Sequence, residues 1–120
     1  MLFRSIVAAG ASCVLAFGLT AGANAESMGC TGTIYGSWVN DQGGVFIRGS
    51  WHADHTQMCS LTEVWKGIPT EVCYSWVAKF DAAASTGKSI SVWYQNIASC
   101  STIATYGNSE APYYVMLLNT

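Results

Sequence analysis

The sequence predicts an exported α+β domain: a small antiparallel sheet or barrel that packs against one amphipathic helix and is closed by two disulfides. Three observations support this fold class. Two β-rich runs flank a glycine-rich turn, one later stretch has helical periodicity, and the mature chain has an even number of cysteines. A length of 120 residues suits one domain.

The amino terminus has the three parts of a secretory signal peptide. Arg4 supplies a positive charge, residues 6–19 are uncharged and mostly apolar, and Ala-Asn-Ala at residues 23–25 fits a small-x-small cleavage site. An anchoring transmembrane helix is the alternative, but the apolar run is shorter than the ~20 residues that a span requires. We therefore expect removal of residues 1–25, a single domain at residues 26–120, and a secreted or periplasmic protein with no membrane span.

Two β-rich runs predict a hairpin at the start of the domain. Residues 32–39 (GTIYGSWV) and 45–52 (VFIRGSWH) contain many β-branched and aromatic residues, and residues 40–44 (NDQGG) tolerate positive φ. A glycine inside each run predicts a bulge or sharp bend, as a small barrel needs. Alternation in the second run separates an apolar face, Val45, Ile47 and Trp51, from a mixed face, Phe46, Arg48, Ser50 and His52.

Helical periodicity is clearest in the stretch between Pro69 and Gly87, where a helix of about fifteen residues is expected to lie against the sheet. Residues 88–95 alternate as a strand, and residues 113–118 (YYVMLL) predict a last, largely buried strand. The apolar stripe of the helix consists of Val72, Cys73, Trp76, Val77, Phe80, Ala83 and Ala84.

The cysteines predict two disulfides. Cys13 leaves with the signal peptide, and the four that remain permit three pairings. We favour Cys59–Cys73, which closes a short loop between a strand end and the first helical turn, and Cys30–Cys100, which ties the start of the domain to a late strand. Each is expected to contribute about 3–4.5 kcal/mol. Zinc is the alternative, but the spacing contains no C-x-x-C pair, so we predict no metal.

Charge and motif content argue against several classes of function. The chain has five basic and seven acidic side chains, and the loss of Arg4 leaves a mature net charge of −3. Nucleic acid and anionic membranes both require clustered Lys and Arg, so neither is an expected partner. The chain has no G-x-S-x-G nucleophile elbow and its cysteines are expected to be oxidised, so we predict a non-catalytic protein without a cofactor.

The stretch GSWHADHTQMC at residues 49–59 is the candidate ligand-binding segment. Its two histidines are the only ones in the mature chain, and a zinc cage needs more ligands, so a polar strand end is the better interpretation. A disulfide beside this loop would hold it rigid and lower the entropy lost on binding. We predict ligand binding by Trp51, His52, Asp54 and His55. The alternative site is the aromatic-rich segment around Trp93, Tyr94 and Tyr106.

The mature chain contains five Trp and six Tyr, more rings than so small a core is expected to absorb. Rings left at a surface with few charges suit stacking on sugar rings or burial under another subunit. For any single ring, Trp76 included, a place in the core is the more frequent outcome.

The order of hairpin, Cys-bearing strand, helix and then STGKSISVWYQ at residues 85–95 resembles the later half of the B subunits of subtilase-cytotoxin and pertussis-like toxins. The similarity is strongest over residues 70–95, and its motif, a Ser-Thr-Gly turn between a helix and a strand, is short. It implies an exported OB-like domain that binds glycans and assembles into homo-oligomeric rings. GSWHADHTQMC and APYYVMLLNT match no receptor-binding motif of that family, so no sugar-contact residue is carried over.

Two classes of function remain open. The first is a glycan-binding or toxin-accessory module. The second is a periplasmic or secreted inhibitor or protein-interaction domain, which a disulfide-clamped, loop-rich domain serves equally well. A neighbouring gene for an exported A-subunit-like enzyme would favour the first class, and dependence on a co-secreted hydrolase would favour the second.

Overall fold

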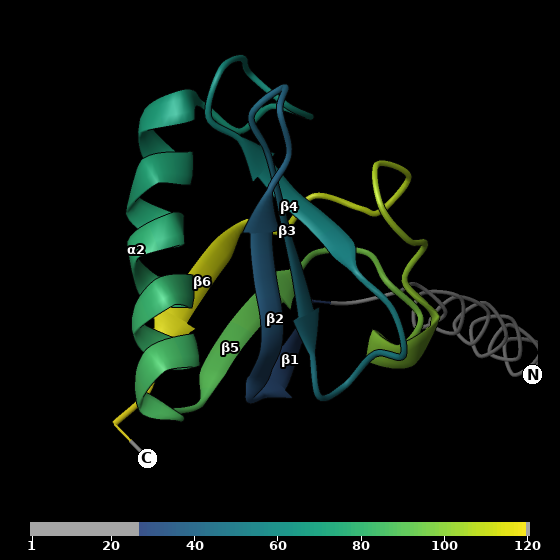
Figure 1. Cartoon of the computed structure of the whole chain (residues 1–120). Helices are drawn as coiled ribbons and strands as arrows, with labels where there is room; N and C mark the ends of the chain where they lie inside the picture. Colours follow the sequence, from purple (N-terminus) through teal and green to yellow (C-terminus); the bar gives the residue numbers. More distant parts are fainter. Residues whose placement is uncertain (1–26, 120) are drawn as a thin grey trace, which may run out of the picture.

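Two three-stranded antiparallel sheets and one long helix make up the residues that the computed structural model describes, 27–119. The predicted signal peptide, residues 1–25, lies outside these residues. The strand orders are β1-β5-β6 and β2-β3-β4, and the helix α2 contacts strands of both sheets. Figure 1 shows α2 along one side of the strands. The α+β class predicted from the sequence is confirmed.

The first sheet joins the beginning of the domain to its end. β1 (Met28–Gly32) pairs with β5 (Ile90–Tyr94), which also pairs with β6 (Tyr114–Leu117). The sequence did not predict β1, because two glycines in five residues weaken its β signal. The predicted burial of the last strand is wrong. β6 lies at the edge of its sheet, and only Val115 among its four residues is buried.

The second sheet contains the predicted hairpin. β2 (Ile34–Val39) pairs with β3 (Gly44–Gly49), and β3 pairs with β4 (Thr56–Ser60). A bulge interrupts the pairing of β2 with β3 between Ile34 and Gly36, as the glycine predicts. The predicted extension of the second strand to residue 52 is wrong, because the chain turns after Gly49.

The chain crosses between the two sheets at one residue, Thr33, which separates β1 from β2. The carbonyl of Thr33 accepts a hydrogen bond of 2.9 Å from the N–H of Ser50, and this bond ties the crossing to the end of β3. Strands that pass from one sheet to another at bends or bulges form the corners of small sandwiches and barrels. The two sheets therefore enclose one core.

Helix α2 (Thr70–Thr86) begins after Pro69 and ends at Gly87, whose φ is 77° and whose N–H donates to the carbonyl of Ala83. Its buried stripe is narrower than predicted, because Val72 and Ala84 are exposed. The side chains that α2 buries are Cys73, Trp76, Phe80 and Ala83. They pack against Val45, Ile47, Met58, Ile90, Val92, Tyr94 and other residues of one continuous apolar core.

Both predicted disulfides are present. Cys59–Cys73 links β4 to the first turn of α2, and Cys30–Cys100 links β1 to the chain after β5. Cys100 was predicted on a strand, but it begins the short 3-10 helix η1 (Cys100–Thr102). The two bridges therefore fix one end of the helix and one irregular segment to the sheets.

The disulfides are expected to differ in their effect on stability. Cys30–Cys100 spans 70 residues and Cys59–Cys73 spans 14, so the chain-entropy relation gives about 4.4 and about 3 kcal/mol. Chemical denaturation of Cys30→Ala/Cys100→Ala and of Cys59→Ala/Cys73→Ala measures both values. If Cys59→Ala/Cys73→Ala lost more free energy of unfolding than Cys30→Ala/Cys100→Ala, chain entropy would not be the main source of the stabilisation by the disulfides.

Candidate functional site

The predicted binding residues lie in the loop that joins β3 to β4, and the structure divides them into two groups. Trp51 points toward the core and is only partly exposed. Its ring lies on Gly49, where an added Cβ would be 2.5 Å from the indole. Trp51 therefore helps to build the protein, and glycine at position 49 makes room for it.

His52 is buried, and both of its ring nitrogens have partners. Nδ1 accepts a hydrogen bond of 3.0 Å from the backbone N–H of Asp54, so Nε2 carries the proton and donates to the carbonyl of Ile103 at 2.7 Å. The neutral ring therefore links the β3–β4 loop to the segment at residues 103–109. It has no ring nitrogen left for a ligand.

Asp54 and His55 form the exposed part of the loop. Oδ1 of Asp54 accepts a hydrogen bond of 2.8 Å from the N–H of His55 and lies 3.4 Å from Nδ1 of the same residue. The side chains are 48% and 28% exposed. Of the four predicted residues, these two combine solvent exposure with polar groups, whereas His52 is buried and Trp51 packs against the core.

Tyr106 lies beside this pair although it is far away in the sequence. Its N–H donates to the carbonyl of His55 at 2.8 Å, and its carbonyl accepts from the N–H of Gln57 at 3.3 Å. Its φ of 52° is in the left-handed region, which costs a non-glycine residue energy and persists where surrounding contacts fix the backbone. Ser109 adds such contacts through two hydrogen bonds to the backbone of Gln57.

Two rings of the hairpin complete the cluster. Trp38 and Phe46 are cross-strand partners, and their rings stack with centroids 4.3 Å apart. The Trp38 centroid is 5.6 Å from the His55 ring and 6.5 Å from the Tyr106 ring. Trp38 is 37% exposed and Tyr106 is 44% exposed, whereas Phe46 is buried. We call Trp38, Phe46, Asp54, His55 and Tyr106 the aromatic face.

The charges of the aromatic face are coupled. The backbone N–H of His55 lowers the pKa of the Asp54 carboxyl below its ordinary 3.8, and the Tyr106 hydroxyl and the His55 side chain act in the same direction. The hydrogen bond to Asp54 and its negative charge raise the pKa of Tyr106. At neutral pH the aromatic face therefore presents an ionised carboxylate beside a neutral phenol.

The alternative aromatic segment does not form one site. Tyr94 is fully buried, and its burial raises the pKa of its hydroxyl. Trp93 stacks on Tyr114 with ring centroids 5.4 Å apart, and both belong to the sheet β1-β5-β6, whereas Trp38 and Phe46 belong to the sheet β2-β3-β4. Only Tyr106 reaches the aromatic face.

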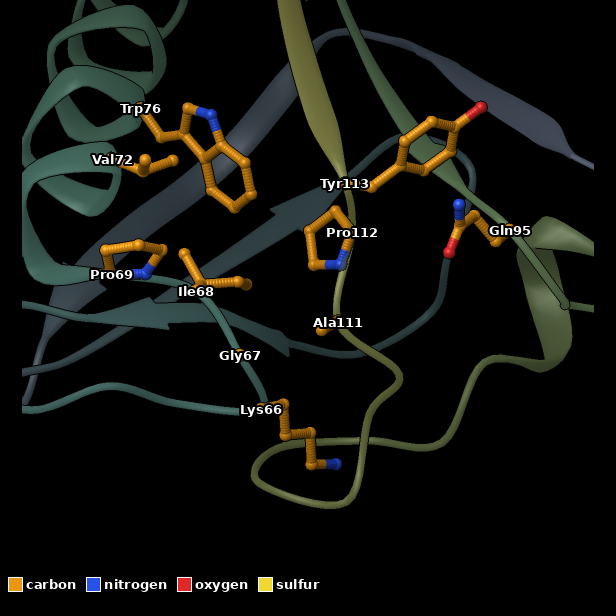
Figure 2. Close-up of a pocket in the computed structure, with 10 residues that line it drawn as sticks. All are labelled: Lys66, Gly67, Ile68, Pro69, Val72, Trp76, Gln95, Ala111, Pro112 and Tyr113. Atoms are coloured by element: carbon orange, nitrogen blue, oxygen red, sulfur yellow. The ribbon is translucent and has the colours of Figure 1, made fainter.

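A hollow of about 390 Å³ lies elsewhere, between the start of α2 and the segment before β6. Figure 2 shows Trp76, Ile68 and Pro69 on one side and Pro112 and Tyr113 on the other. Gln95 and Lys66 also line the hollow, and the Lys66 ammonium donates to the carbonyl of Ser109 at 2.6 Å. None of the residues predicted to bind ligand lines this hollow.

Within residues 27–119, no group of three or more His, Cys, Asp or Glu side chains is arranged to hold a metal ion. No helix in this part of the chain combines the length and the apolar character needed to cross a membrane.

Comparison of the chain with protein-family models, curated proteins and solved structures finds no match. The site is therefore assigned from its geometry. Sequence reasoning missed Trp38 and Phe46, although the hairpin contained the signal. Pairing the runs around residues 40–44 places these rings opposite each other.

The two histidines are expected to respond differently to substitution. His52→Ala leaves the Asp54 N–H and the Ile103 carbonyl without their partner, which should lower the free energy of unfolding by about 2–3 kcal/mol. His55→Ala removes a partly exposed ring and should change the free energy of unfolding by no more than about 0.5 kcal/mol. Urea denaturation measures both, and equal losses would contradict the assigned roles.

The Asp54 carboxyl should titrate below 3.8 in the folded protein, which side-chain NMR measures. In Tyr106→Phe its pKa should rise, yet stay below 3.8 because the His55 N–H remains. Because folding lowers this pKa, the ionised Asp54 carboxylate stabilises the folded protein at pH values above its pKa in the unfolded chain. This stabilisation is lost as the pH falls through the pKa of the folded protein. An identical Asp54 pKa in Tyr106→Phe would refute the contact with the phenol.

Proposed function

We propose that the mature protein is a secreted or periplasmic, non-catalytic glycan-binding module whose contact surface is the aromatic face. The observation that supports it best is the pair of exposed rings, Trp38 and Tyr106, beside a carboxylate and an imidazole. Sugar rings have apolar faces that pack on aromatic side chains and hydroxyl edges that need hydrogen-bonding partners. The aromatic face offers both.

The proposal gives Asp54 and His55 a binding role. A lowered pKa keeps Asp54 ionised, so it accepts hydrogen bonds from hydroxyl groups. A general acid at neutral pH needs a raised carboxyl pKa instead. The direction of the shift thus suits recognition better than proton transfer.

The framework around the aromatic face limits the entropy cost of binding. Tyr106 is held through its backbone by His55 and Gln57, and the loop is held by the buried ring of His52. A preformed surface loses less conformational entropy when a ligand binds. The resemblance of residues 70–95 to toxin B subunits also supports glycan binding. That resemblance further implies that copies of this chain assemble into rings, which is part of the proposal.

A protein-interaction or inhibitor role is the second candidate function. Its support is the 390 Å³ hollow at the start of α2, whose walls include Ile68, Pro69, Trp76 and Pro112. Apolar pockets of this kind accept apolar side chains of a partner. Capture of a co-secreted hydrolase that Val72→Asp abolishes would favour this role over glycan binding.

Glycan-array screening of the oxidised mature protein tests the proposed function. Trp38→Ala should weaken binding to the best glycan at least about tenfold, which corresponds to about 1.4 kcal/mol. His55→Ala should weaken it at a nearly unchanged melting temperature, and Asp54→Ala should weaken it in a protein that is less stable but still folded at the assay temperature. Tyr74→Ala removes an exposed ring from α2 and should bind like the wild type. A wild-type protein that binds no glycan would refute the proposal.

A further inference from the structure

A second, polar hollow of about 180 Å³ opens at the β2–β3 turn. The turn and the chain that follows β4 lie side by side, as Figure 1 shows. The N–H of Leu61 donates to the carbonyl of Gly43 at 2.8 Å, and the Thr62 hydroxyl donates to the carbonyl of Gln42 at 2.7 Å. The residues that line the hollow are Asn40, Gln42, Gly44, Gln57, Ser60, Glu63 and Trp65. We call them the hairpin hollow.

Hydrogen bonds within the protein determine which polar groups the hairpin hollow offers. Oδ1 of Asn40 accepts from the N–H groups of Gln42 and Gly44 at 3.0 and 2.9 Å, so the Asn40 NH₂ group is the one left free to donate. Nε2 of Gln57 donates to the carbonyl of Cys59 at 3.2 Å, so this nitrogen already has a partner within the protein. Glu63 adds an exposed carboxylate. Donors and acceptors thus stand together.

The hairpin hollow adjoins the aromatic face at Gly44. A Cβ added at Gly44 would lie 3.0 Å from the Phe46 ring, 3.2 Å from Nε2 of Gln57 and 3.4 Å from Nδ2 of Asn40. Phe46 in turn stacks on Trp38. Phe46 of the aromatic face is therefore next to Gly44, which lines the hollow, and the absence of a side chain at Gly44 leaves this space open.

We propose that the hairpin hollow is a hydroxyl-binding subsite for an uncharged sugar residue of the glycan that the aromatic face holds. This inference rests on the proposed function and names its ligand class. Paired donors and acceptors match vicinal hydroxyl groups, each of which both donates and accepts. A hollow of about 180 Å³ has room for several water molecules, which the hydroxyl groups at the edge of a sugar ring can replace. Glu63 is the one charged residue of the lining, so a carboxylated sugar would be repelled.

Titration of the ¹⁵N-labelled mature protein with glucose and with glucuronate tests the subsite and its preference for uncharged sugars, since the two differ only at C6, where a carboxylate replaces the hydroxymethyl group. Galactose and mannose extend the neutral set. We expect a neutral sugar to shift the Asn40 side-chain amide, the Gly44 amide and the Trp65 indole, and glucuronate to leave them unchanged. Equal shifts with glucuronate would overturn the ligand class. Shifts confined to Trp38, His55 and Tyr106 would overturn the subsite and leave the proposed function standing, and no shift anywhere would overturn both.

Two conservative substitutions test the same subsite by affinity for the best neutral glycan. Asn40→Asp keeps the oxygen that accepts from the turn and removes the free NH₂ group, and Glu63→Gln removes the carboxylate charge. Each should weaken binding about tenfold, as expected for one lost hydrogen bond to a charged or well-placed group. Asp41→Asn changes the charge of the same turn outside the hollow and is the matched control. Wild-type affinity in both test variants, with Trp38→Ala impaired, would overturn the subsite alone.

Discussion

The buried imidazole of His52 is the interaction on which the exposed surface depends. It joins the N–H of Asp54 to the carbonyl of Ile103, two groups that lie far apart in the sequence. Besides this ring, the loop that carries Asp54 and His55 and the segment that carries Tyr106 are joined by the bonds of Tyr106 and Ser109 to the start of β4 and by the contact of the His55 and Tyr106 rings. A neutral ring suits this position, because one nitrogen must accept while the other donates. The most polar stretch of the sequence thus acts first as a structural link and only at its exposed end as a binding surface.

The two disulfides also anchor segments that lie next to the aromatic face. Cys100 is fixed to β1 three residues before Ile103, the acceptor of the His52 ring, so the chain that leads to Tyr106 starts from a covalently anchored point. Cys59 is fixed to α2 two residues after Gln57, which borders the hairpin hollow and whose N–H donates to the carbonyl of Tyr106. Each bridge therefore stabilises the domain and also limits the motion of residues that face solvent. Irregular segments can hold defined positions in so small a protein for this reason.

The sequence predicts those parts of the fold that depend on local periodicity or on the number of cysteines. The hairpin, the helix and β5 follow from patterns within a few residues, and the number of disulfides follows from the cysteine count. Spacing alone permits three pairings, and the expected positions of Cys59 at a strand end and Cys73 in the first helical turn favour the one observed. β1 and the exposure of β6 do not, because a glycine-rich strand and an edge strand are defined by their neighbours in space. The site divides in the same way: Asp54 and His55 stand out by composition, whereas Tyr106 joins them only through tertiary hydrogen bonds. Burial of His52 likewise follows from the position of Ile103, which no local pattern encodes.

The hairpin turn has two roles that explain why its residues are so constrained. Asn40 closes the turn by accepting two backbone N–H groups, and that use of its oxygen turns its NH₂ group outward. Gly44 starts β3, and its lack of a side chain leaves room beside the Phe46 ring. The geometry that ends one strand and begins the next therefore also creates a polar hollow next to stacked aromatic rings. A ligand that spans both would meet an apolar surface and a hydrogen-bonding surface fixed to the same two strands, so neither would need to reorganise relative to the other on binding.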